Sequence, residues 1–277
     1  MNKILIFFAM TFIINCRDND RQFDWVNNLP HAWKLSESEF GGYLAQFQNR
    51  YPDYADRLKA LNLWRVGTPY GLYCLGEEKG EDNDPIIRND SSDCTVHMLT
   101  TLAFAESYDW KSARNAILDI HYKAGSNNKK EATFKSRWHF TADRLLNHDR
   151  TIDITKSLAE SGNLEIVEIE LNKKEDGEEF LDLKWTLKDS ISFIPMENLN
   201  KTIISKAPSV CGIAFVKRSY FKMGIMIAHE GFLIDRSRLV HASSEFGETV
   251  NVDFFDYIKK KNEYRFDGVM LFKIEPK

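Results

Sequence analysis

The stretch Asn89-Asp90-Ser91-Ser92-Asp93-Cys94-Thr95-Val96-His97-Met98-Leu99 passes from a polar turn through a cysteine into an apolar helical pattern. Ser91 or Ser92 suits the position that caps a helix N-terminus, and Asp93 suits the first turn. The sequence therefore predicts that Cys94 lies at the start of a helix. Unpaired backbone N–H groups and the helix dipole lower the pKa of a thiol there, so we expect Cys94 to be a nucleophile.

The composition of the 277-residue chain is that of an ordinary globular protein, with 43% hydrophobic and 28% charged residues. It predicts one large domain over residues 31–277 rather than two. The formal net charge of −4 provides no basic field for nucleic acid, so we expect no nucleic-acid partner. No glycine-rich phosphate-binding loop occurs, and we expect a monomer without a cofactor.

The N-terminus has the pattern of an export signal. Met1-Asn2-Lys3 is short and basic, and the apolar run from Ile4 to Ile14 is too short to span a bilayer. We therefore expect a signal peptide at 1–15, a polar tether at 16–30 and a location in the periplasm or cell envelope. Cys16 resembles the lipidated cysteine of bacterial lipoproteins. The alternatives are simple secretion and an unprocessed, buried N-terminal helix.

The cysteines and histidines carry no metal-binding pattern. There is no C-x-x-C among the four cysteines and no H-x-x-x-H among the seven histidines, so we expect no metal site and no disulfide framework. A disulfide bond between Cys74 and Cys211 is the alternative that the sequence leaves open. Cys211 lies in an apolar, strand-like segment and is expected to be a small core residue.

The periodicity of the chain changes from helical to alternating after Gly162. We predict helical insertions around 108–160 and a hairpin around 163–188, with its second strand at 180–185. Further strands are expected at 210–217, 223–234, 238–243 and 267–274. Helices that precede strands predict an α+β fold, in which a helical N-terminal part packs on an antiparallel sheet.

Two histidines lie on predicted strands that the turn Asp235-Arg236-Ser237 would join. His229 is in the first strand and His241 in the second. Paired strands can bring both imidazoles to one helix N-terminus. The predicted relay is Cys94 as nucleophile, His229 as general base and His241 as the residue that orients His229.

Four motifs resemble those of the NlpC-like, papain-fold peptidoglycan cysteine hydrolases, and are closest to the N-acetylmuramoyl-L-alanine amidase-like branch. In chain order they are Gly67-Thr68-Pro69-Tyr70, Asp93-Cys94, His229-Glu230-Gly231-Phe232 and His241-Ala242-Ser243-Ser244. The resemblance runs from about residue 60 to the end of the chain. It implies a papain-like fold and supports the same three catalytic residues.

The resemblance also implies residues that bind substrate. Tyr70 would line the site, and Asp93 would shape the helix start and bind a polar group. Ser243 is a further candidate for substrate binding. His97 lies one turn after Cys94, where it could touch the same site and bind substrate; the alternative is a residue of the helix surface or the packing. The backbone N–H of Cys94 would be one oxyanion donor. The sequence departs from the family pattern at Val96, His97 and Glu230.

The function that follows is that of a secreted cysteine hydrolase acting on peptidoglycan or muropeptides. It would cleave the muramoyl–L-alanine bond or a stem-peptide bond through a thioester acyl-enzyme. Membrane contact would come only through a lipid anchor at Cys16. The alternatives are a non-catalytic envelope lipoprotein that binds cell-wall peptides and a lipid-acting acyltransferase relative.

Overall fold

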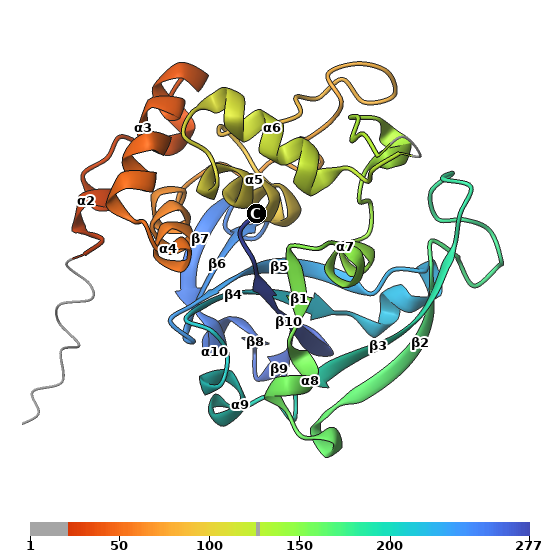
Figure 1. The fold of residues 1–277 in the computed structure, drawn as a ribbon. Coiled ribbons are helices and arrows are strands. Elements are labelled where there is room, and N and C mark those ends of the chain that lie inside the picture. Colours follow the sequence, from red (N-terminus) through yellow and green to blue (C-terminus); the bar gives the residue numbers. More distant parts are fainter. Residues whose placement is uncertain (1–21, 126–127) are drawn as a thin grey trace, which may run out of the picture.

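The computed structural model describes residues 22–125 and 128–277 of the chain. The predicted signal peptide at 1–15 and the predicted lipidation site Cys16 lie outside the described residues. Helices dominate the N-terminal part and strands the C-terminal part (Figure 1). The protein thus has the predicted α+β architecture, with helices packed against an antiparallel sheet.

The helices divide into a group of long ones and a set of short ones. The long ones are α3 (Glu37–Arg50), α4 (Tyr54–Trp64), α5 (Cys94–Ala105) and α6 (Trp110–His121). The short ones are α2 (Asp24–Asn27), α7 (Thr141–Asn147), α8 (Thr155–Leu158), α9 (Lys201–Ser205) and α10 (Phe254–Tyr257). Four 3₁₀ turns complete them: η1 (Ala32–Lys34), η2 (Phe134–Ser136), η3 (Ser161–Asn163) and η4 (Arg218–Met223).

Helix α5 is the centre of the helical group. Every residue from Val96 to Ala105 is buried, as expected for a helix that is apolar on all sides. It packs against α3, α4 and α6 and against the strands β5 and β6 (Figure 1). The start of α5, and with it Cys94, is therefore held in place by contacts with both layers.

The sheet is antiparallel and has the order β2-β3-β10-β4-β5-β6-β7, with β1 paired to β10. Its strands are β1 (Thr151–Asp153), β2 (Glu165–Leu171), β3 (Leu187–Pro195), β4 (Val210–Val216), β5 (Ile227–Ile234), β6 (Arg238–Ser243), β7 (Glu248–Asp253) and β10 (Gly268–Ile274). The short strands β8 (Lys259–Lys260) and β9 (Glu263–Tyr264) form a separate ribbon.

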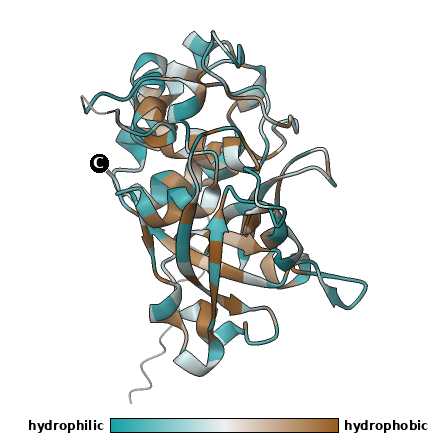
Figure 2. Cartoon of the chain, turned by 90° about the vertical axis from the view of Figure 1, so that its right-hand side faces the viewer, coloured by the Kyte–Doolittle hydropathy of each residue, from teal (hydrophilic) through white to brown (hydrophobic). Residues whose placement is uncertain are grey.

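Apolar side chains cover both faces of this sheet. One core lies between the sheet and the long helices, and the other lies beneath α9 and α10. Figure 2 shows hydrophobic residues along the inner strands and hydrophilic residues on the outer loops. Alternate residues of one strand thus belong to different cores, because successive side chains point to opposite faces of the sheet.

Three predictions about local structure need correction. The described part of the predicted tether contains α2, and both Phe23 and Val26 are buried, because their apolar side chains pack on the helical group.

The second strand of the predicted hairpin is β3 and not the segment 180–185. The buried side chain of Asn172 binds the backbone of Leu181 and Trp185, which holds that segment as a loop. Strand β5 begins at Ile227, after η4, and not at 223.

The cysteines of the described residues are free, so Cys74 and Cys211 form no bridge. Cys211 is buried in β4, as predicted. No helix within 22–125 and 128–277 combines the length and apolar character needed to cross a membrane.

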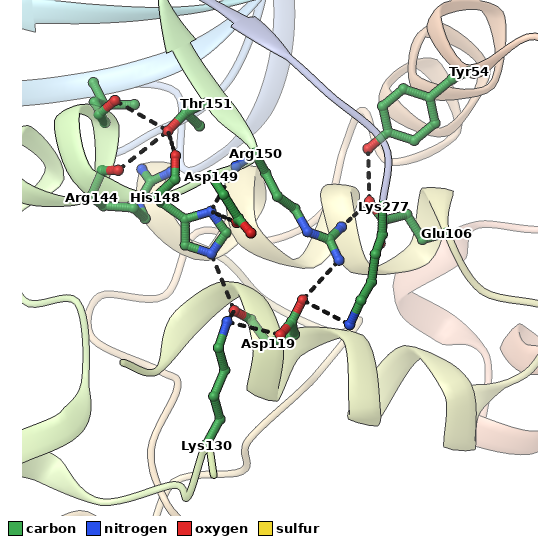
Figure 3. Close-up of polar contacts among 11 residues, drawn as sticks. Tyr54, Glu106, Asp119, Lys130, Arg144, His148, Asp149, Arg150, Thr151 and Lys277 are labelled. Atoms are coloured by element: carbon green, nitrogen blue, oxygen red, sulfur yellow. Dashed lines mark hydrogen bonds and ion pairs between the residues drawn. The ribbon is translucent and has the colours of Figure 1, made fainter. Parts of the chain in front are cut away.

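A polar cluster around Asp119 ties the end of the chain to the helices (Figure 3). Asp119, on α6, makes ion pairs with Lys130 at 2.8 Å, with Arg150 at 2.9 Å and with Lys277 at 3.3 Å. Arg150 also pairs with Glu106, just after α5. The cluster therefore joins α6 and the end of α5 to the segment before β1 and to the C-terminus.

Candidate active site

Cys94 is the first residue of α5, and the residue that caps the helix is Asp93, not Ser91 or Ser92. One Asp93 carboxylate oxygen accepts the N–H of Val96 at 2.8 Å, and the other accepts the N–H of Tyr73 at 2.9 Å. Aspartate is a strong capping residue because its carboxylate satisfies an orphan N–H and complements the helix dipole. Asp93 thus sets the helix start and anchors the preceding loop to it.

His229 and His241 lie on the adjacent strands β5 and β6, which the turn Asp235-Arg236-Ser237 joins as predicted. His229 Nε2 and His241 Nδ1 are 2.7 Å apart. A bulge in β5 lies just before His229, at the point where Phe215 pairs with His229 and Val216 pairs with Ile227. Bulges of this kind re-aim side chains, and they occur often beside active sites.

An aromatic cage surrounds the two imidazoles. The His229 ring stacks on Phe215 at 5.6 Å and on Phe266 at 6.1 Å, and the His241 ring lies 4.4 Å from that of Tyr257. Burial in this cage lowers the pKa of His229 well below its usual value and that of His241 to about 4. Both histidines are therefore neutral at pH 7.

The thiol of Cys94 has a raised pKa, contrary to the prediction from its place at a helix start. Burial and the negative charges of Asp93 and Glu230 raise this pKa to about 12. The backbone N–H of Glu230 and the hydroxyl of Thr95 lower this pKa, but less strongly. The resting site therefore holds a neutral thiol beside a neutral imidazole.

A cleft of about 930 Å³ opens onto Cys94 and His229. Its walls come from the loop around 70–75, the segment 134–142, the residues before and at the start of β5, and the segment 242–245. Tyr70, Asp93 and Ser243, for which substrate binding is predicted, line this cleft. Burial, followed by the charges of Cys94 and Asp93, raises the pKa of Tyr70 to about 12. The Ser243 hydroxyl also accepts the N–H of Phe246 at 3.3 Å.

His97 does not belong to this cleft, so its predicted substrate-binding role is wrong. Its side chain is 0% exposed and its Nε2 lies 2.9 Å from Oδ1 of Asn62, on α4. The His97 ring also packs edge-on against Phe232. Position 97 faces the helical core because α5 is buried on all sides, and this histidine is a core residue.

Glu230 takes part in a buried polar cluster that no sequence pattern predicted. Its carboxylate pairs with Arg144 of α7 at 2.5 Å and accepts the hydroxyl hydrogens of Thr95 at 2.9 Å and Thr141 at 3.3 Å. The only signal in the sequence was a lone acidic residue within an apolar strand. Its partner Arg144 is 86 residues away, and nothing in the sequence connects the two.

No group of three or more His, Cys, Asp or Glu side chains in the described part of the chain is arranged to hold a metal ion. The cleft brings together the Cys94 thiol, the imidazole of His229, whose Nε2 contacts His241, and the N–H groups at a helix start. This set can perform nucleophilic attack on a carbonyl with general-base assistance.

The protein resembles several solved structures in fold. A Legionella pneumophila protein of the DUF1460 family has a TM-score of 0.71 and 22% identity, covering 86% of this chain and 94% of its own. An N-acetylmuramoyl-L-alanine amidase from Bacteroides uniformis has a TM-score of 0.58 and 17% identity, covering 80% and 99%. A candidate xylanase from Bacteroides fragilis has a TM-score of 0.59 and 19% identity, covering 78% and 99%.

The comparison with family models is more specific than these structural likenesses. No curated protein matches the chain. The model of the AmiA-like family, described as N-acetylmuramoyl-L-alanine amidase-like, matches residues 62–268, which is more than half of the chain and includes Cys94, His229 and His241. The chain therefore belongs to the AmiA-like, N-acetylmuramoyl-L-alanine amidase-like family.

Proposed function

We propose that the protein is a cysteine amidase that hydrolyses an amide bond of peptidoglycan, at the muramoyl–L-alanine linkage or within the stem peptide. The observation that carries this proposal is the 2.7 Å contact between His229 and His241 in the cleft that Cys94 also lines. Family membership supports the amidase chemistry and the polymer. The NlpC-like, papain-type relationship is part of the same proposal.

The mechanism starts from neutral groups. For His229 to accept a proton at Nδ1, its Nε2–H must donate to Nδ1 of His241, and their 2.7 Å separation suits this hydrogen bond. As the Cys94 sulfur attacks the amide carbonyl, its proton passes to His229. The carbonyl electron pair moves to oxygen, where the N–H groups at the start of α5 stabilise it.

The remaining steps return the enzyme to its starting state. Collapse of the tetrahedral intermediate breaks the C–N bond, and the amine leaves with the proton from His229. This leaves an acyl group on Cys94 as a thioester. Water, deprotonated by His229, then attacks the thioester, which releases the carboxylic acid and restores the thiol.

The cellular location belongs to the proposal as well. Peptidoglycan lies outside the cytoplasm, and the pattern at 1–16 is that of an export signal with a lipidation site at Cys16. We propose an exported protein of the periplasm or cell envelope. Labelling with a radioactive fatty acid should mark the wild type but not Cys16→Ala.

The test is digestion of purified cell walls and muropeptides, followed by mass spectrometry of the products. The wild type should release new fragments whose masses identify the bond, and Cys94→Ala should release none. Cys211→Ala is a matched control, because Cys211 is also a free cysteine but is buried in β4, outside the cleft lining, and should keep activity. Equal products from wild type and Cys94→Ala would refute the proposal.

The raised pKa of Cys94 favours one alternative, a protein that binds cell-wall peptides without cleaving them. In that case muropeptides should bind in the cleft, and the same digestion should leave them intact with both wild type and Cys94→Ala. Isothermal titration calorimetry together with mass spectrometry of the recovered ligand separates the two functions.

A further inference from the structure

Strand β5 places two consecutive functional side chains on opposite faces of the sheet. His229 pairs across the strands with Phe215, which belongs to the core beneath α9 and α10. Glu230 pairs with Ala214, which belongs to the core beneath the long helices. The base and the carboxylate are therefore fixed by the same few residues of backbone, but they meet different partners.

The carboxylate of Glu230 reaches the helix of the nucleophile. It accepts the hydroxyl of Thr95 at 2.9 Å, and Thr95 directly follows Cys94. Glu230 thus links the start of α5 to β5, immediately beside the base.

The third element in this contact is α7, which lies on the same side of the sheet as α5 (Figure 1). Arg144 of α7 pairs with the second carboxylate oxygen of Glu230 at 2.5 Å, with the two side chains 2% and 1% exposed. Nε and Nη1 of Arg144 have no hydrogen-bond partner among the described residues. A buried pair with unsatisfied donors is a poor source of net stability, so stability alone does not account for it.

We propose that Glu230 is a positioning residue, which Arg144 holds in place and which uses its bond to Thr95 to set the Cys94 sulfur against the imidazole of His229. This inference rests on the proposed amidase function. It assigns to the insertion that contains α7 a role in holding the nucleophile and the base together. The reacting atoms themselves remain those of Cys94, His229 and the substrate.

The mildest test is Thr95→Val, which removes the hydroxyl and keeps the shape of the side chain. We expect kcat to fall about tenfold, the scale of one lost hydrogen bond to a charged group, with KM little changed. Thr100→Val is the matched control, because Thr100 is a buried threonine of the same helix whose hydroxyl donates to the backbone carbonyl of Val96. It should keep the wild-type kcat. A Thr95→Val enzyme with wild-type kcat would overturn the inference.

A second measurement does not depend on amidase activity. Glu230→Gln removes the negative charge beside Cys94, so the thiol should ionise at lower pH and react faster with iodoacetamide at pH 7.5, while kcat falls. A variant that merely unfolds would react faster at Cys74 and Cys211 as well, which peptide mapping detects. An unchanged rate at Cys94 would overturn the inference.

The two proposals fail in different ways. If the wild type cleaves no wall material but Glu230→Gln changes the alkylation of Cys94 alone, the proposed function is wrong and the influence of Glu230 on the thiol stands. If the wild type cleaves and both Thr95→Val and Glu230→Gln behave like it, the amidase assignment stands and the positioning role is refuted.

Discussion

Cys94 experiences two opposing influences, and their balance decides how it reacts. A helix start favours the thiolate, whereas burial and the carboxylates of Asp93 and Glu230 favour the thiol. The second influence is the larger, so the thiol pKa is raised to about 12. We infer that the sulfur becomes nucleophilic only while its proton passes to His229, and not through a standing ion pair.

The pH dependence of the reaction follows from His229. The pKa of this histidine is lowered well below its usual value by burial, so the neutral base persists as the pH falls below 6.5. We expect kcat/KM at pH 6 to equal that at pH 7 and to decline only at lower pH. Initial rates on a defined muropeptide between pH 4 and 9 measure this. A loss of activity centred near pH 6.5 would contradict it.

His241 should matter through the orientation of His229. His241→Ala removes the partner of His229 Nε2, and we expect kcat to fall by up to roughly 10,000-fold, the scale for a group that orients a catalytic histidine. His241→Asn retains an oxygen near the former Nδ1 and should recover part of this loss. Steady-state kinetics of both variants provides the comparison, and equal activity of His241→Ala and wild type would exclude the relay.

The elements that build the site are the start of α5 and the bulged beginning of β5. Asp93 caps α5 and also accepts the N–H of Tyr73, so the helix and the loop along the cleft share one anchor. The bulge before His229 turns that side chain toward the cleft, while Glu230 faces α5 and α7. The geometry of the site thus depends on contacts between elements rather than on one loop.

Replacing the cap tests this dependence. Asp93→Ala removes both hydrogen bonds, and we expect the free energy of unfolding to fall by about 1–2 kcal/mol. Asp93→Asn keeps an oxygen for the N–H of Val96 and should lose less. Urea denaturation followed by circular dichroism measures both changes. A destabilisation by Asp93→Asn as large as that by Asp93→Ala would show that the charge, and not the cap, is what counts.

At the scale of the whole molecule, the cluster around Asp119 joins parts of the chain that are far apart in sequence (Figure 3). Burial alone would raise the pKa of Asp119, but hydrogen bonds and charges from Lys130, Arg150 and Lys277 outweigh it and lower that pKa well below its usual value. The cluster stabilises the docking of the C-terminus and of the segment before β1 against α6.

This shift predicts the acid sensitivity of the fold. Because the pKa of Asp119 is lower in the folded state, its contribution to stability is complete above the unfolded value of about 3.9 and is lost as the pH falls toward the folded value. Asp119→Asn should therefore unfold at a lower temperature than wild type at pH 7. The difference should shrink below about pH 4. Thermal unfolding at several pH values checks this, and a difference that does not change with pH would contradict it.

Much of this architecture follows from neighbours along the chain. Helical and alternating periodicities are local, so residue order alone placed Cys94 at a helix start, His229 and His241 on strands joined by a short turn, and helices before strands. The second strand of the hairpin was predicted at the wrong residues, because Asn172 holds 181–185 as a loop through tertiary hydrogen bonds.

Packing decided the remainder, because burial and long-range pairing depend on residues that are distant in sequence. It turned His97 toward Asn62 and away from the cleft, and it raised the pKa of Cys94 where a helix start alone would lower it. Packing also brings Glu230 and Arg144 together, a contact that no local sequence pattern predicts. The sequence alone thus predicted Cys94, His229 and His241 as the residues of the relay. Their protonation states and their positions were decided by the packing of the surrounding core.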